Sequence, residues 1–188
     1  MERIKNVKKK LLSHRLRGFS DIEHTPSAFK KACIYQIPYI EIDVRASRDG
    51  VLFVYHNPIS GSDIGGRIDF RKNISTEIQK NKFINGESIL DLETALELFK
   101  KYRSKNQVLC IDIKDYGYEH KYIQSVKKYN LINSIHFISW IPQTIFRLYN
   151  LGAKAPLIFS HLNIMRYGNT GRMLKKLIKN KIIILITI

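Results

Sequence analysis

The sequence predicts an α/β protein of the TIM (β/α)8 barrel type. Short apolar segments alternate with amphipathic segments of helical period along the 188 residues, which is the order typical of a largely parallel sheet. No glycine-rich phosphate fingerprint follows the first expected strand, and this argues against a dinucleotide-binding fold. Charged and titratable residues stand at the ends of several expected strands, where barrels of this type place their chemistry.

The expected elements begin near the N-terminus. A short strand at 11–14 precedes a helix for which Thr25 supplies the N-cap and Pro26 the first helical position. The next two strands are expected at 39–44 and 51–55. Their apolar, β-branched composition suits a buried sheet.

A polar, glycine-bearing stretch at about 57–87 has no clear period, and we interpret it as a long loop or small insertion within a single domain covering 1–188. Asp91 is expected to cap the helix that follows, whose apolar face repeats at spacings of three and four: Leu92, Ala95, Leu96 and Phe99. Later strands, separated by amphipathic helices, are expected at 108–113, 134–139, 155–159 and 182–188.

The charge of the chain is strongly positive, with 32 Lys+Arg against 16 Asp+Glu and a formal net charge of +16. A phosphate-rich partner is one explanation. However, the lysines are scattered, and they cluster only at Lys8-Lys9-Lys10 and around 175–181. Because the chain also lacks a nucleic-acid motif, we expect a solvated basic surface and no nucleic-acid partner; a nucleic-acid-binding module is the minor alternative.

Features of secreted or membrane proteins are not visible in the sequence. Cys33 and Cys110 lie in apolar contexts that are typical of buried free thiols, and no Cys/His spacing fits zinc. The N-terminus has positive charge but no apolar core of a signal peptide. No run approaches the roughly 18 to 20 apolar residues of a transmembrane span. We therefore expect a cytoplasmic location.

Four expected strands end in titratable residues: Ser13-His14-Arg15, Glu41-Ile42-Asp43, Tyr55-His56 and Asp112-Ile113-Lys114. Side chains two positions apart on a strand share a face, so Glu41 and Asp43 project together, as do Asp112 and Lys114. Neighbouring carboxylates repel one another unless a cation or base lies between them. Three oxygen ligands suit Mg²⁺ or Ca²⁺ better than zinc.

A hairpin would add a histidine to this group. Asp49-Gly50 is a favoured two-residue turn. If residue 48 pairs with 51, Asp43 faces His56. A crossover connection between the two strands is the alternative.

Each of these features also has a purely structural explanation. The Asp112–Lys114 pair can be an ion pair at a barrel mouth, a histidine at a strand end can be structural, and Arg15 and Arg17 can be surface charges. Their coincidence at four strand ends is what favours a functional site.

These motifs, in their order along the chain, resemble the signature of the glycerophosphodiester phosphodiesterase family. That signature reads His-Arg-Gly, Glu-Asn-Thr, Glu-x-Asp-Val, Asp-Gly and His-Asp. The matching segments are Ser13-His14-Arg15, Glu23-His24-Thr25, Ile40–Val44, Asp49-Gly50 and Tyr55–Pro58. Three later segments resemble a helix, a Glu-x-Lys strand and a Ser-Phe strand end of the family: Leu92–Leu96, Ile111–Lys114 and Ser139-Trp140. The resemblance covers essentially the whole chain.

The chain departs from the family pattern in several places. Leu16-Arg17 intervenes before the glycine, so either arginine could be the phosphate-binding one; we favour Arg15. His24 stands where the family has Asn, and Asn57 stands where Asp is usual. Asp112 replaces a Glu, which shortens that ligand by one methylene.

The resemblance implies hydrolysis of glycerophosphodiesters to glycerol phosphate and an alcohol, with the adjacent glycerol hydroxyl attacking first to give a cyclic phosphate. It implies that one divalent cation, Mg²⁺ or Ca²⁺, is held by Glu41, Asp43 and Asp112. It further implies phosphate contacts from two cations and proton transfer by two imidazoles: Arg15 and Lys114, and His14 and His56.

By the same resemblance, the strand near 181–188 is the penultimate one of the barrel, so we expect the last strand and its helices to be missing. A catalytically inactive truncated remnant of the family is therefore one alternative. A related phospholipase C/D-like enzyme, acting on a lipid-derived rather than a small-molecule phosphodiester, is the other.

Overall fold

A computed structural model of the chain describes residues 11–160, 167–180 and 182–186. Its centre is one sheet in which parallel strands follow in the order β1-β2-β4-β5-β6-β7. The bounds are β1 Leu12–Ser13, β2 Tyr39–Ala46, β4 Val108–Ile113, β5 Ile135–Ser139, β6 Leu157–Ser160 and β7 Ile183–Ile186. The predicted basic run Lys8-Lys9-Lys10 and the last two residues of the predicted terminal strand lie outside the described residues.

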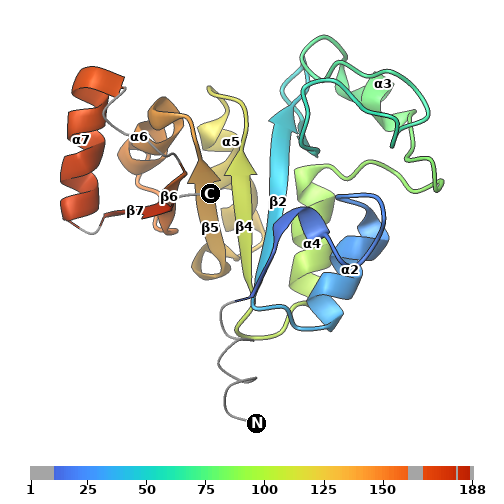
Figure 1. The fold of residues 1–188 in the computed structure, drawn as a ribbon, viewed down its shortest axis with the longest axis horizontal. Helices are drawn as coiled ribbons and strands as arrows, with labels where there is room; N and C mark the ends of the chain where they lie inside the picture. The colour runs from blue at the N-terminus through green and yellow to red at the C-terminus, as the bar shows by residue number, and fades with distance from the viewer. Residues whose placement is uncertain (1–10, 161–166, 181, 187–188) are drawn as a thin grey trace.

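Helices follow the strands along the chain, and the predicted α/β alternation is confirmed. They are α2 Pro26–Ile34, α4 Leu92–Tyr102, α5 Glu119–Lys128, α6 Pro142–Asn150 and α7 Gly168–Lys179. Helices α2 and α4 lie side by side next to β2, whereas α5 and α6 accompany β4 and β5 (Figure 1). In the described ranges, no helix is both long and apolar enough to cross a membrane.

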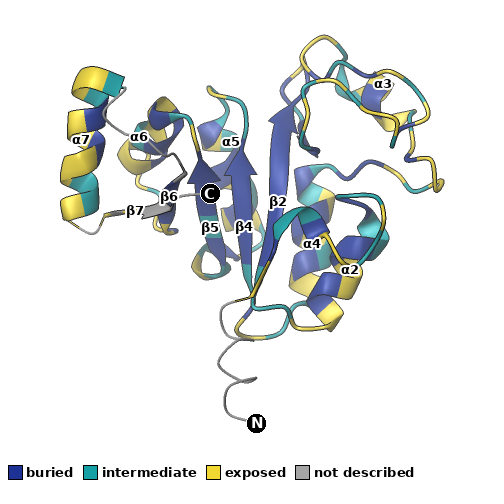
Figure 2. Cartoon of the chain, in the orientation of Figure 1, coloured by how far each residue is buried: buried dark blue, intermediate teal, exposed yellow. Residues whose placement is uncertain are grey.

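The two predicted helix caps are present. Thr25 Oγ1 accepts a hydrogen bond from the Ala28 N–H at 3.3 Å, and Asp91 Oδ1 accepts one from the Thr94 N–H at 2.7 Å. Each cap satisfies a backbone donor that the helix itself leaves unpaired. The predicted apolar face of α4 is buried against the sheet, and Figure 2 shows the same division into buried and exposed faces along the helices.

The two faces of the sheet bury different residues in its central strands. On the helix side, alternate residues such as Ile40, Ile42 and Val44 belong to the main core. The opposite face carries a smaller apolar cluster of Cys110, Ile138 and Ile158. This second cluster lies beside the polar residues of the same face, with Cys110 opposite Glu41 and Ile138 opposite Asp112 in the strand register. Burial raises the pKa of the Cys110 thiol to about 12, so this cysteine is an inert core residue.

The hairpin after β2 is real, but its predicted register is wrong by one residue. Strand β3 (Leu52–Val54) pairs antiparallel with β2, with Ala46 opposite Leu52. The Ser47 N–H donates to the Val51 carbonyl at 2.9 Å, so the loop has three residues instead of two. Gly50 ends it with a φ of 77°, the left-handed conformation that three-residue hairpin loops require. Asp43 is consequently opposite Tyr55 and not His56.

The stretch at 57–87 is more ordered than its polar composition suggests. It contains helix α3 (Ser75–Gln79) and lies beyond the carboxyl end of β2 (Figure 1). It also shares a separate buried cluster with the hairpin: Phe53, Tyr55, Ile64, Ile68, Phe70, Ile78, Phe83 and Ile89. The spacing of these residues follows neither a helix nor a strand period, so sequence periodicity could not reveal them.

Phe70 is the residue by which this second core can be tested. Its ring is fully buried, stacks on the ring of Tyr55 and contacts the ring of Phe53 at a tilted angle. We expect Phe70→Ala to lower the free energy of unfolding by about 3–5 kcal/mol, because it removes a buried ring and leaves a cavity. Urea unfolding measures this. Ile84→Ala is the control, since Ile84 is 66% exposed, and a comparable loss in that variant would contradict the assignment of the core.

Candidate functional site

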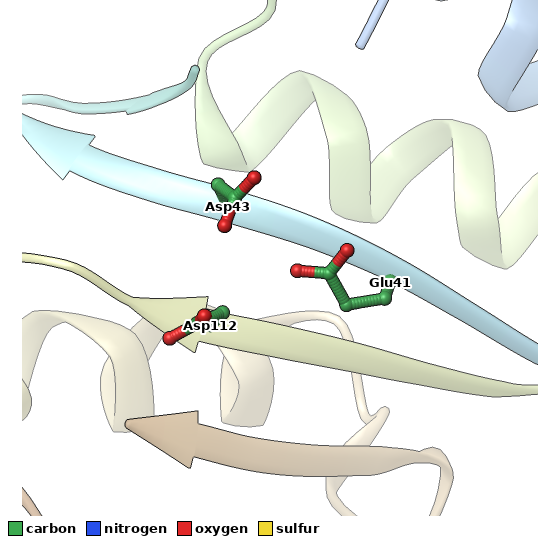
Figure 3. Close-up of side chains that lie close together, drawn as sticks. All are labelled: Glu41, Asp43 and Asp112. Atoms are coloured by element: carbon green, nitrogen blue, oxygen red, sulfur yellow. The ribbon is translucent and has the colours of Figure 1, made fainter. Parts of the chain in front are cut away.

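Three carboxylates meet at the carboxyl ends of two neighbouring strands. Glu41 and Asp43 extend from β2 and Asp112 from β4, and the strand register places Asp43 beside Asp112 (Figure 3). One oxygen or more of each carboxylate lies within 4.8 Å of the others. The predicted grouping of these residues is confirmed, because the i, i+2 alternation and the parallel pairing both direct them to one face.

The donor set fits a hard divalent cation. Carboxylate oxygens bind Ca²⁺ at about 2.3–2.6 Å and Mg²⁺ at about 2.0–2.1 Å, so two oxygens on one ion lie at most about 5 Å apart on Ca²⁺ and about 4 Å apart on Mg²⁺. The separations here, all within 4.8 Å, fall inside the limit for Ca²⁺ and slightly above that for Mg²⁺. Among the described residues, the buried Asp112 Oδ1 and both Asp43 oxygens make no hydrogen bond of good geometry. Buried oxygens in this condition are unusual unless another group binds them. Asp112, although shorter than Glu, still reaches the cluster.

Burial and the neighbouring charges shift the pKa values of all three carboxyl groups. Burial raises the pKa of Glu41 well above its usual value, and the neighbouring Asp43 charge adds to the effect. Burial also raises the pKa of Asp112, against the opposing influence of Lys114. Burial alone would raise the pKa of Asp43, but His24 and the Lys114 ammonium hold it below its usual range. A bound cation would favour the ionised form of all three.

Arg15 reaches the cluster from a strained turn. The predicted first strand ends one residue early, and His14 to Leu16 form a 3-10 turn. Arg15 and Leu16 have φ values of 53° and 61°, a conformation that non-glycine residues adopt at a cost of about 1–2 kcal/mol each. The turn directs the Arg15 N–H to Glu41 Oε2, where it donates a hydrogen bond at 2.8 Å.

Both predicted phosphate-binding cations lie against the carboxylates. Arg15 Nε is 3.2 Å from Asp43 Oδ2. Lys114 Nζ lies between two carboxylates, 2.7 Å from Asp43 Oδ1 and 2.6 Å from Asp112 Oδ2. These carboxylates outweigh the effect of burial and raise the pKa of Lys114, so it remains charged. Arg17, the alternative arginine, pairs instead with Glu23 at 2.6 Å and is largely exposed.

Both predicted histidines border the site. His14 Nε2 is 3.9 Å from Glu41 Oε2, and its side chain is 43% exposed. His56 Nε2 lies 2.6 Å from Arg15 Nη2. Because arginine only donates hydrogen bonds, Nε2 is the acceptor and Nδ1 donates to Asn57 Oδ1 at 2.9 Å. Burial lowers the pKa of both imidazoles, with Arg15 contributing, so each is neutral near pH 7.

His24 was not assigned a role from the sequence, yet it packs directly against Asp43. It is 1% exposed and has a φ of 61°. Its Nε2 accepts a hydrogen bond from the Asp43 N–H at 3.2 Å and lies 3.4 Å from Asp43 Oδ2. Burial lowers the pKa of His24 to about 4, so it is neutral near pH 7. The Glu-x-Thr context before a helix was the signal that could have indicated it.

The sequence reading also overlooked Arg45 and Asp115. Arg45 Nη1 donates to Asp115 Oδ1 at 3.2 Å, and Arg45 Nε donates to the His56 carbonyl oxygen at 2.6 Å. Strand alternation could have found Arg45, because it follows Glu41 and Asp43 at the same spacing.

A polar cavity of about 340 Å³ adjoins His56. Its lining comes from the turn before α2, the end of the hairpin and the insertion, and includes Glu23, His24, Tyr55 and Asp63. Space for part of a small molecule therefore exists beside the imidazole.

The chain resembles known proteins over most of its length. The model of the glycerophosphoryl diester phosphodiesterase family matches residues 11–147. A glycerophosphodiester phosphodiesterase of Caldanaerobacter subterraneus subsp. tengcongensis is 28% identical over 136 residues, which cover 66% of this chain and 55% of that protein. A second curated relative is covered over 64% of its length. The chain thus spans less than two thirds of both relatives.

Solved structures share the fold. A glycerophosphodiester phosphodiesterase from Thermotoga maritima superposes with a TM-score of 0.69 at 23% identity, covering 94% of this chain and 72% of that one. An Oleispira antarctica phosphodiesterase in complex with the product sn-glycerol-3-phosphate superposes with a TM-score of 0.72 at 18% identity, covering 94% and 83%.

The crowding of the carboxylates predicts that Glu41→Gln changes the stability of the chain in a pH-dependent way when a chelator is present. The folded-state pKa of Glu41 is raised, so the stability of the parent chain falls as pH rises from about 4.5 through that pKa, because the unfolded state ionises first. Each unit of the shift corresponds to about 1.4 kcal/mol. The variant should match the parent below pH 4.5 and be more stable at pH 7, as measured by urea unfolding. A variant that is less stable than the parent at pH 7 in chelator would contradict this account.

Proposed function

This chain belongs to the glycerophosphoryl diester phosphodiesterase family, whose model matches residues 11–147, and on that premise we propose that its site hydrolyses glycerophosphodiesters to glycerol phosphate and an alcohol with one divalent cation. The observation that carries the proposal is the cluster of Glu41, Asp43 and Asp112, whose oxygens lie within 4.8 Å of one another. Buried carboxylates that lie this close together are suited to hold a divalent cation, and a phosphodiester can bind to the same cation.

The charge balance of the site supports this proposal. Three carboxylates are accompanied by two cationic side chains, Arg15 and Lys114, which contact them directly. A Mg²⁺ or Ca²⁺ ion held by the three carboxylates would neutralise charge on the phosphoryl group and on the transition state. Arg15 and Lys114 stand beside the same oxygens, so they would donate N–H groups to the phosphate from fixed positions.

The two imidazoles suit proton transfer. Hydrolysis of a phosphodiester requires removal of a proton from the attacking hydroxyl and delivery of a proton to the departing alkoxide. His14 and His56 border the cluster from the ends of β1 and β3, and burial keeps the pKa of each below its ordinary value. A neutral imidazole can accept the first proton, and its partner, after taking up a proton from water, can supply the second.

The product that we propose is the one bound in a solved structure of similar fold. The Oleispira antarctica phosphodiesterase was solved with the product sn-glycerol-3-phosphate, and this chain shares its fold. We therefore propose glycerol phosphate as the product here, with the alcohol released from the other side of the phosphorus.

Metal dependence tests the proposal directly. Release of glycerol 3-phosphate from glycerophosphocholine or glycerophosphoethanolamine should stop in chelator and return with Mg²⁺ or Ca²⁺. Glu41→Ala should abolish the activity while the circular dichroism spectrum stays that of the parent. Glu97→Ala, on the exposed side of α4, is the matched control and should be fully active. Undiminished activity of Glu41→Ala in chelator would exclude the proposed metal site.

The histidines make a separate prediction. His14→Ala and His56→Ala should each lower kcat by about 10² to 10⁴, the usual value of proton transfer by a positioned group. His120→Ala and His136→Ala are controls that should change kcat little, because neither lies at the site. A parent-like rate in His14→Ala or His56→Ala would remove that residue from the mechanism.

A further inference from the structure

Arg45 is the last member of the polar row on β2. Side chains at alternate positions of a strand share a face, so Arg45 lies on the face that carries Glu41 and Asp43. It is only 8% exposed, and a buried arginine is rare unless its N–H groups are paired. No part of the proposed reaction yet uses it.

The guanidinium of Arg45 connects two strand ends. Nε donates to the His56 carbonyl oxygen at 2.6 Å, and Nη1 donates to Asp115 Oδ1 at 3.2 Å. The second oxygen of Asp115 accepts a hydrogen bond from the Ala46 N–H at 3.1 Å. Asp115 follows Lys114 directly, so one planar group ties the segment after β4 to the segment after β3.

His56 depends on such support because it lies beyond the sheet ladder. The last backbone pairing of the hairpin joins the Tyr55 N–H to the Asp43 carbonyl at 3.0 Å. In the part of the chain that the structure describes, the main chain of His56 is held by the hydrogen bond from Arg45. Its ring then lies 2.6 Å from Arg15 Nη2, so a change in the position of residue 56 moves the imidazole relative to the carboxylate cluster.

We propose that Arg45 is a positioning residue that sets the place of the His56 imidazole by holding its carbonyl oxygen, with Asp115 as the anchor of the guanidinium. This inference rests on the proposed function, because it assigns Arg45 an effect on the proton transfer performed by His56. The geometry needs arginine in particular, since its fork offers two donors in fixed relative directions, whereas a lysine ammonium offers a single point charge.

A double-mutant cycle tests the inference. Arg45→Met should lower kcat by roughly 10- to 100-fold with KM little changed, because misplacing a catalytic group by about 1 Å costs up to about 10² in rate. In the His56→Ala background, the same substitution should cost less than about threefold, since the group that it positions is already gone. An equal loss in both backgrounds, or an unchanged kcat, overturns the proposal.

Arg71→Met is the matched control. Arg71 Nη2 lies 3.5 Å from the same Asp115 oxygen and its side chain is 66% exposed, but it makes no described contact with His56. Its kcat should equal that of the parent. If Arg45→Met does not fold, Asp115→Asn replaces it in the cycle, because this change weakens the anchor without leaving a cavity. The same non-additivity with His56→Ala is expected, and additive losses overturn the proposal.

An inactive parent chain would count against the proposed function. The claim that Arg45 positions His56 is then tested by NMR, which needs no activity. In ¹⁵N-labelled protein, Arg45→Met should shift the amide and ring signals of His56, whereas Arg71→Met should not, and the signals of His136 should stay in place in both. Unshifted His56 signals in Arg45→Met overturn the positioning role whatever the activity.

Discussion

The mutual repulsion of three buried carboxylates is the constraint around which the rest of the site is arranged. Glu41, Asp43 and Asp112 are all buried, with oxygens within 4.8 Å of one another, so the fold tolerates them only with compensating charge nearby. Lys114 and Arg15 supply part of this compensation through ion pairs with the same oxygens. Burying charge without partners costs several kcal/mol, which makes these contacts a condition of folding as well as a feature of the site.

Backbone strain and side-chain hydrogen bonds place the remaining groups. Arg15 and His24 adopt left-handed conformations at two separate turns, and each residue contacts a carboxylate of β2: the Arg15 N–H donates to Glu41, and His24 Nε2 lies 3.4 Å from Asp43 Oδ2. Strained residues of this kind concentrate at functional sites because the surrounding structure holds them there. On the other side, Arg45 links the segments that follow β3 and β4. The site thus combines carboxylates on the sheet with side chains from loops that are tied to it.

Two buried apolar clusters adjoin the polar residues of the site, one on the sheet and one in the insertion. Cys110, Ile138 and Ile158 lie beside the carboxylates on the same face of the sheet. Beside them, the insertion packs its own core on the hairpin and contributes Asp63 and neighbouring residues to the cavity next to His56. A low-dielectric surrounding strengthens every charge interaction at the site.

The sequence alone determined the α/β alternation, the caps at Thr25 and Asp91, and the shared face of Glu41 and Asp43, because period, capping chemistry and strand alternation are local rules that short segments obey by themselves. The grouping with Asp112 was predictable as well, because barrels of this type place polar groups together at the carboxyl ends of their strands. Only the tertiary structure decided the hairpin register, where Gly50 admits a third loop residue and moves Asp43 opposite Tyr55. It also decided that His24 and Arg45 belong to the site and that residues 57–87 possess a core. These features depend on contacts between residues far apart in the chain, and no local periodicity records such contacts.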